Sequence, residues 1–118
     1  VLHMGDVFFN GMYPFIDTSS GGSIDGLISG VDRALEVVDE HTAIIPGHGP
    51  VADRHTLSTY RDMLAEAREA IVVLMDDGMS REQVVEARPT RTLDERWGDG
   101  FMQPDQWVGI VYDGMARH

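Results

Sequence analysis

The sequence predicts an α/β fold in which a small sheet carries amphipathic helices on one face. Two short apolar runs rich in β-branched and aromatic residues, at 1–9 and 42–45, indicate strands. Each run is followed by a segment whose apolar residues recur every three or four positions, which is the spacing of an amphipathic helix. The 118 residues are expected to form a single domain.

The first predicted strand is interrupted. Val1–Met4 is extended and apolar, Gly5-Asp6 breaks the run, and Val7–Phe9 resumes it. Asn10-Gly11 is a strong turn dipeptide, and a loop is expected over 12–22. Natural chains seldom begin inside an extended apolar run, so we expect this sequence to be a fragment of a longer protein.

The first helix is expected to begin near Ser23 and to end at 39–41. Gly26 and Gly30 lie four positions apart on one side of it, and this spacing favours close packing against a neighbouring element. Helical glycine is otherwise unfavourable by about 1 kcal/mol. The apolar stripe of the helix consists of Ile24, Leu27, Ile28, Val31, Leu35 and Val38.

A short buried strand is expected at 42–45, and a tight, rigid turn at Pro46–Pro50 follows it. The longest helix is expected to begin after the N-cap Asp53 and to end at Gly78, in the position that glycine favours. A capping box at Ser80–Gln83 then opens a short third helix.

Residues 90–103 are expected to be irregular, with Trp97 and Phe101 as anchors, and a last helix is expected over 104–116. Two or three strands with helices on one face leave the other face of the sheet uncovered. Because so short a sheet is not stable by itself, that face is expected to meet a partner.

The composition excludes several classes of function. The net charge is −11 and all nine basic residues are scattered arginines, which argues against nucleic acid and anionic membrane surfaces as partners. Without cysteine there are no disulfides or thiolate nucleophiles, and without lysine there is no Schiff base or P-loop. The sequence has no apolar run of 18 residues. Chemistry is therefore left to Asp, Glu, His, Ser, Thr, Tyr and Arg, or to a metal that they hold.

Two short segments are candidates for a metal site. Asp6 follows one predicted strand and His48 follows the other, and ligands of α/β sheets gather outside the carboxyl ends of strands. Carboxylate and imidazole together are usual ligands of zinc, iron or manganese. Gly5, Gly47 and Gly49 would let the backbone turn sharply beside them and leave room for the ion. Asp6 and His48 are assigned as metal ligands, and no catalytic side chain is assigned.

The order of these segments resembles the C-terminal half of the metallo-β-lactamase-fold hydrolases. The resemblance covers nearly the whole chain, from Gly5-Asp6 through Gly21-Gly22-Ser23 to Ile45–Pro50, and Pro46-Gly47-His48-Gly49-Pro50 is its most specific part. The stretches Asp6–Asp17, with Tyr13-Pro14-Phe15-Ile16-Asp17, and Trp97–Tyr112 are similar to a bacterial branch of small-molecule hydrolases. The resemblance implies that residues 1–118 are the C-terminal half-domain of an αββα sandwich whose N-terminal half is absent.

Members of that family usually hold one or two metal ions, often zinc, and attack lactams, esters, thioesters or phosphoesters with a hydroxide on the metal. By resemblance, Asp6 matches the aspartate that bridges the two metals and His48 the last histidine ligand. The family's main signature, His-x-His-x-Asp-His, is absent from this sequence, as is the histidine between it and the aspartate. The chain alone is therefore expected to be inactive.

The other candidate residues have plainer interpretations. His41 is expected to cap the first helix at its C-terminal end, and His55 and His118 to be exposed. His3 and Asp6 should point to opposite faces of a strand. Tyr13 and Asp17 could line a substrate cleft, but a loop role is favoured.

A second hypothesis remains open beside the hydrolase fragment. The chain could be a non-catalytic α/β module that self-associates through its bare sheet face. In both cases a homodimer is expected, with Val1, Val7, Phe9 and Ile44 as candidates for the exposed apolar face.

Overall fold

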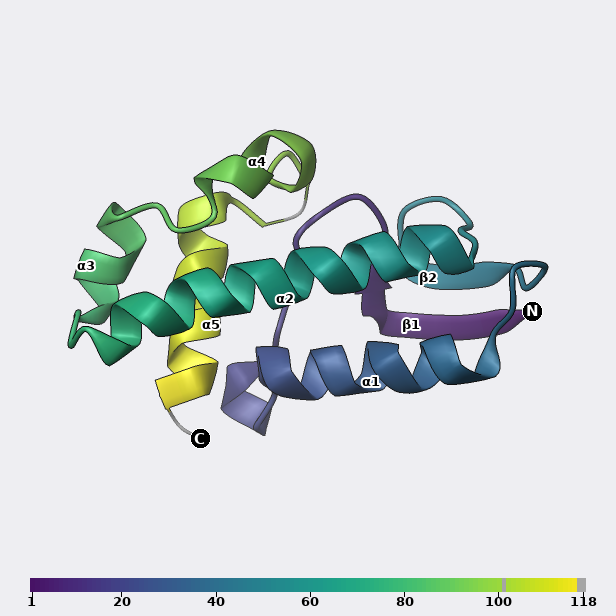
Figure 1. Ribbon diagram of the computed structural model, residues 1–118, viewed down its shortest axis with the longest axis horizontal. Coiled ribbons are helices and arrows are strands. Elements are labelled where there is room, and N and C mark those ends of the chain that lie inside the picture. Colours follow the sequence, from purple (N-terminus) through teal and green to yellow (C-terminus); the bar gives the residue numbers. More distant parts are fainter. Residues whose placement is uncertain (101, 117–118) are drawn as a thin grey trace.

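The computed structural model describes residues 1–100 and 102–116, and for Asp6 and Ser20 it describes the backbone only. Along the chain it contains β1 (Leu2–Phe9), η1 (Thr18–Ser20), α1 (Ile24–Val37), β2 (Ile44–His48), α2 (Arg54–Asp76), α3 (Arg81–Glu86), α4 (Arg91–Trp97) and α5 (Pro104–Ala116) (Figure 1).

β1 and β2 form a two-stranded parallel sheet. Leu2 pairs with Ile44, Gly5 with Pro46 and Phe9 with His48, and the register shifts on both sides of Gly5. Gly5 has a φ of +58°, a left-handed conformation that glycine adopts without strain. The interruption read from the sequence is therefore an irregularity inside one strand rather than a break between two.

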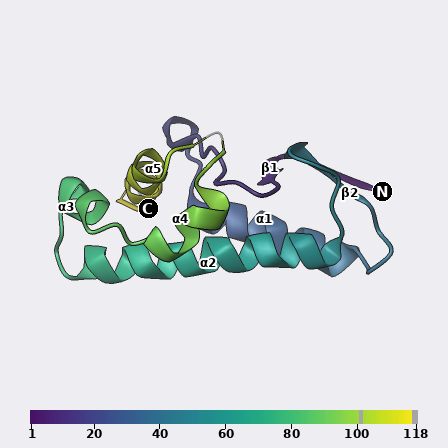
Figure 2. The same ribbon diagram turned by 90° about the horizontal axis from the view of Figure 1, so that it is seen from above.

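The helices α1 and α2 lie on the same side of the sheet (Figure 2). Phe8 reaches from β1 to Tyr60 of α2, with ring centroids 4.9 Å apart, and both side chains are fully buried. Ile44 of β2 and Leu57 of α2 are also fully buried. The α/β class, with a small sheet and amphipathic helices on one face, is thus confirmed.

The ends of the helices follow their capping residues. Ser23 caps α1, Asp53 caps α2, and Ser80 and Gln83 form the complete capping box of α3. Gly78 ends the segment after α2 with a φ of +83°. Each of these boundaries was predicted from the sequence. The last helix, α5, was predicted as well. It crosses α2 at a steep angle (Figure 1).

Two predicted elements were wrong. Residues 91–97 form the helix α4 instead of an irregular segment, because Asp94 accepts a hydrogen bond from Thr90 in its first turn and Trp97 is buried at its end. Phe101 lies outside the described residues. The turn expected at Pro46–Pro50 begins later, because β2 continues to His48 through its pairing with β1.

The predicted exposed apolar face was wrong in half of its members. Ile44 is 0% exposed because it faces the helices, and Phe9 is 2% exposed with its ring stacked on His48. Val7 is partly buried near Gly30 of α1. Val1 is exposed as expected. None of the described helices is long and apolar enough to cross a membrane.

Candidate functional site

The parallel pairing of β1 and β2 brings their carboxyl ends to the same end of the sheet. His48, the last residue of β2, pairs with Phe9, the last residue of β1. The backbone carbonyl of His48 accepts a hydrogen bond of 2.9 Å from the amide of Asn10, which extends the pairing beyond β1. Asp6 lies on β1 between Gly5, which pairs with Pro46, and Phe9.

His48 is exposed, while its neighbour Phe9 is buried. The two rings are stacked, with centroids 4.5 Å apart and planes 20° from parallel. This contact orients the imidazole at the surface, at the carboxyl end of β2. The side chain of Asp6 lies outside the described part, so the predicted proximity of its carboxylate to the imidazole of His48 stays a prediction.

The loop after β2 depends on glycine at one position. Gly49 has a φ of +95°, and a Cβ atom there would lie 2.5 Å from the carbonyl oxygen of Asn10. Asn10 also donates its side-chain amide to the carbonyl of Pro50, at 2.9 Å. The turns after β1 and β2 are therefore held against each other. Gly47, in contrast, lies within β2 and has no positive φ.

The other histidines lie apart from His48 or belong to other contacts. His3 is exposed on β1 and pairs with Ile45, and His55 is exposed in the first turn of α2. The expected capping role of His41 was wrong, because α1 ends at Val37 and the chain leaves it in an extended conformation at Val38.

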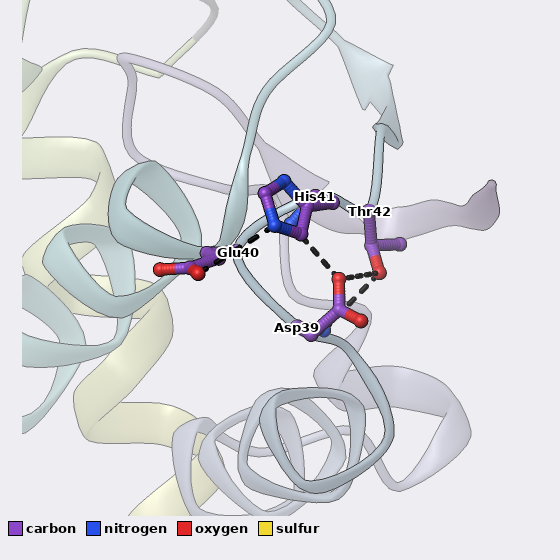
Figure 3. A network of polar contacts seen from close by, with 4 residues as sticks. All are labelled: Asp39, Glu40, His41 and Thr42. Carbon is purple, nitrogen blue, oxygen red and sulfur yellow. Dashed lines mark hydrogen bonds and ion pairs between the residues drawn. The ribbon is translucent and has the colours of Figure 1, made fainter.

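Instead, His41 belongs to a turn that precedes β2 (Figure 3). Its backbone amide donates to Asp39 at 2.8 Å, and its ring lies 3.6 Å from Glu40. The hydrogen bonds from the His41 amide and the Thr42 hydroxyl lower the pKa of Asp39. The side chains of Asp39, Glu40 and His41 are exposed and Thr42 is partly buried, so these contacts order a turn at the surface.

Asp6 and His48 would give a metal ion two protein ligands. Carboxylate and imidazole are the right donor types for zinc, but a zinc site needs three or four protein ligands. Among the described residues no group of three His, Cys, Asp or Glu side chains is placed to hold a metal. Asp6 and His48 would account for two of these ligands, and of the two only His48 has a side chain in the described part of the structure.

Tyr13 and Asp17 lie in different surroundings. Tyr13 is fully buried, stacks on Trp107 at 4.2 Å and donates its hydroxyl to Asp94 at 2.7 Å, so it has a structural role. Asp17 is exposed and lines an open surface hollow beside β1. The sequence does not reveal this hollow, because its walls come from β1, the 15–22 loop and α1 together.

A comparison with protein families finds no family model that matches this chain. A comparison with curated proteins finds no match either.

Proposed function

We propose that this chain supplies two ligands, Asp6 and His48, to the metal centre of a hydrolase of the metallo-β-lactamase superfamily. The supporting observation is the parallel pairing of β1 and β2, with His48 at the carboxyl end of β2 beside Phe9 and Asp6 on the neighbouring strand between Gly5 and Phe9. The further ligands would come from a His-x-His-x-Asp-His segment that these 118 residues do not contain.

The exposed imidazole of His48 would hold a divalent ion, zinc or alternatively iron or manganese, together with the carboxylate of Asp6. When bound, such an ion acidifies water and polarises a carbonyl or phosphoryl oxygen, which suits lactams, esters, thioesters and phosphoesters. Phe9 orients the His48 ring by stacking. Gly49 and the Asn10–Pro50 hydrogen bond keep the loop after β2 close to the end of β1.

Zinc titration of the whole chain by calorimetry tests this proposal. We expect weak binding that falls about tenfold or more in His48→Ala and in Asp6→Ala, because each removes one of two ligands. His55→Ala is the matched control, since His55 is also an exposed histidine beside a strand–helix junction. Equal losses in His48→Ala and His55→Ala would contradict the assignment, as would tight binding that neither ligand variant changes.

The coding sequence upstream of the Val1 codon gives a second test. We expect it to encode His-x-His-x-Asp-His and a further histidine. If it does not, the alternative of a non-catalytic α/β module replaces the hydrolase. The chain alone is expected to show no turnover of lactam, thioester or phosphodiester substrates, even with zinc or manganese added.

A further inference from the structure

We infer that Asn10 is a site of spontaneous modification, where the side-chain amide is lost by ring closure onto the backbone nitrogen of Gly11, and that the contact of Asn10 with Pro50 controls the rate. The reaction converts Asn10 into aspartate or isoaspartate beside the end of β2. Asn10 is the only asparagine of the chain, and a glycine follows it directly. The inference is independent of the proposed metal centre.

The backbone nitrogen of Gly11 is open to this reaction. Gly11 is exposed in a turn whose closing hydrogen bond, from the amide of Met12 to the carbonyl of Phe9, is 3.4 Å long. In the part of the chain that the structure describes, the amide of Gly11 donates to no hydrogen-bond acceptor. Glycine has no Cβ atom, so no side chain of residue 11 shields this nitrogen from an attacked carbonyl.

The side chain of Asn10 is held away from ring closure by a contact with the loop after β2. Its amide nitrogen donates to the carbonyl oxygen of Pro50 at 2.9 Å, at an exposed position. The backbone amide of Asn10 donates to the carbonyl of His48, also at 2.9 Å, and this bond keeps the residue in place when the side chain turns. Ring closure needs rotation of the side chain until its carbonyl carbon meets the nitrogen of Gly11. The hydrogen bond to Pro50 opposes that rotation.

The covalent steps need no reactant other than water. The nitrogen of Gly11 forms a bond to the side-chain carbonyl carbon of Asn10, and the bond from that carbon to the amide nitrogen breaks. The amide nitrogen takes up the proton that Gly11 loses and leaves as ammonia. Water then opens the cyclic imide. Attack at the side-chain carbonyl gives aspartate, and attack at the main-chain carbonyl gives isoaspartate, with no change of oxidation state.

Neither product can make the contact that Asn10 makes. A carboxylate only accepts hydrogen bonds, as does the carbonyl of Pro50, so two oxygen atoms would face each other where a donor stood. Isoaspartate also lengthens the main chain at the turn by one carbon. Gly49 packs closely on the same residue, since a Cβ there would lie 2.5 Å from the carbonyl oxygen of Asn10. The modification should therefore release the loop after β2 from the end of β1.

Incubation of the whole chain at physiological temperature and pH tests the inference. Intact mass spectrometry reports the conversion at one position, because the chain has a single asparagine. Chromatography of the N-terminal tryptic peptide separates the two products. We expect isoaspartate among them, because only the cyclic imide yields it. In concentrated urea the rate should rise by roughly fivefold or more, the factor that corresponds to the net free energy of one hydrogen bond.

A pair of glycine variants tests the role of the contact with Pro50. Gly49→Ala displaces Asn10 and should accelerate the conversion of the folded chain by roughly fivefold. Gly78→Ala is the control, because Gly78 also has a positive φ but lies in open space beyond the far end of α2 (Figure 1). It should leave the rate unchanged. Asn10→Asp, which has the side chain of one product, should lower the midpoint of urea denaturation.

Circular dichroism establishes that each variant is folded. If Gly49→Ala is not, the comparison of the unchanged protein in buffer and in urea decides. Aspartate without isoaspartate would overturn the ring closure, and so would a folded chain that stays unmodified while the chain in urea is converted. Equal rates in buffer and urea, or in folded Gly49→Ala and Gly78→Ala, would overturn the control by Pro50. An unchanged midpoint in Asn10→Asp would overturn the release of the loop.

Discussion

At the scale of single residues, Tyr13 connects the loop after β1 to the C-terminal part of the chain. Its hydroxyl donates to Asp94 of α4, its ring stacks on Trp107 of α5, and its amide donates to the carbonyl of Trp97 at 3.0 Å. Asp94 also accepts the hydroxyl of Thr90, the one buried polar residue of the described core. These contacts position the loop that leads from β1 to α1.

Tyr13→Phe should therefore destabilise the protein by about 1–3 kcal/mol, because the hydrogen bond to the carboxylate of Asp94 is lost in a buried environment. The denaturation midpoint in urea measures the effect. Tyr112→Phe, at a partly buried tyrosine of α5, is the control and should change the midpoint less. A midpoint equal to that of the unchanged protein would mean that the hydrogen bond contributes nothing net.

At the scale of elements, the sequence was most informative where a local signal sets a boundary. Asp53, Ser80 and Gly78 act on the backbone within a few residues, so the limits of α2 and the start of α3 were predictable. α4 was missed because it depends on Thr90, Asp94 and the distant Tyr13. The burial of Phe9 and Ile44 was missed for a similar reason, since tertiary packing decides which strand face is covered.

For the candidate site, too, local features could be predicted from the sequence and tertiary contacts could not. The prediction that Asp6 and His48 each follow a strand was wrong, because β1 continues past Asp6 to Phe9 and β2 includes His48 as its last residue. The sequence did predict that the two residues lie on neighbouring strands. It could not predict that the strands pair in parallel with shifts around Gly5, nor that His48 stacks on Phe9. The surface hollow beside Asp17 is formed by β1, the 15–22 loop and α1 together, so it could not be predicted from the sequence.

The loop after β2 allows a prediction with a matched control. Gly49→Ala forces a side chain into left-handed backbone, which costs about 1–2 kcal/mol, and places Cβ against the carbonyl of Asn10. Gly78→Ala has the same backbone requirement, with a φ of +83°, but open space around it. Urea denaturation should show a larger loss of stability for Gly49→Ala. Equal losses would mean that the loop yields to the added methyl group.

At the scale of the whole molecule, the sheet has an open side. Ala52 bridges to Ile44 on one edge of β2, but no further strand pairs with β1 among the described residues. Ile44 is fully buried, so its neighbour Ile45 points to the opposite face of the sheet, where it is partly buried, and Val1, just before β1, is 90% exposed. An open edge and an uncovered face favour association with another strand or sheet. We propose that a second copy of the chain covers them in a homodimer.

Light scattering coupled to size exclusion tests the homodimer. Ile45→Asp should shift the protein to a monomer, because it places a charge on the uncovered face. Val37→Asp, at a 76% exposed position at the end of α1, should leave the dimer intact. A monomeric unchanged protein, or equal effects of the two variants, would contradict this arrangement.

The buried tyrosines give the whole fold a particular response to alkaline pH. Burial raises the pKa of Tyr60 well above its ordinary value of 10.0, and burial together with the hydrogen bond to Asp94 does the same for Tyr13. In the unfolded chain these phenols ionise near pH 10. The unfolded state therefore loses protons first, and the free energy of unfolding falls as pH rises from about 10 toward the folded pKa values.

This decrease in the free energy of unfolding should be simple to interpret, because the chain has neither lysine nor cysteine to titrate in the same pH range. Each buried tyrosine should contribute a slope of up to about 1.4 kcal/mol per pH unit. Urea midpoints should therefore be level at moderately alkaline pH and fall above about pH 10. Tyr60→Phe should lower the midpoint at neutral pH, because the hydroxyl donates to the carbonyl of Val7 at 3.1 Å, yet should make the alkaline fall shallower. If the urea midpoint of Tyr60→Phe decreased with alkaline pH as steeply as that of the unchanged protein, groups other than Tyr60 would have to cause the decrease.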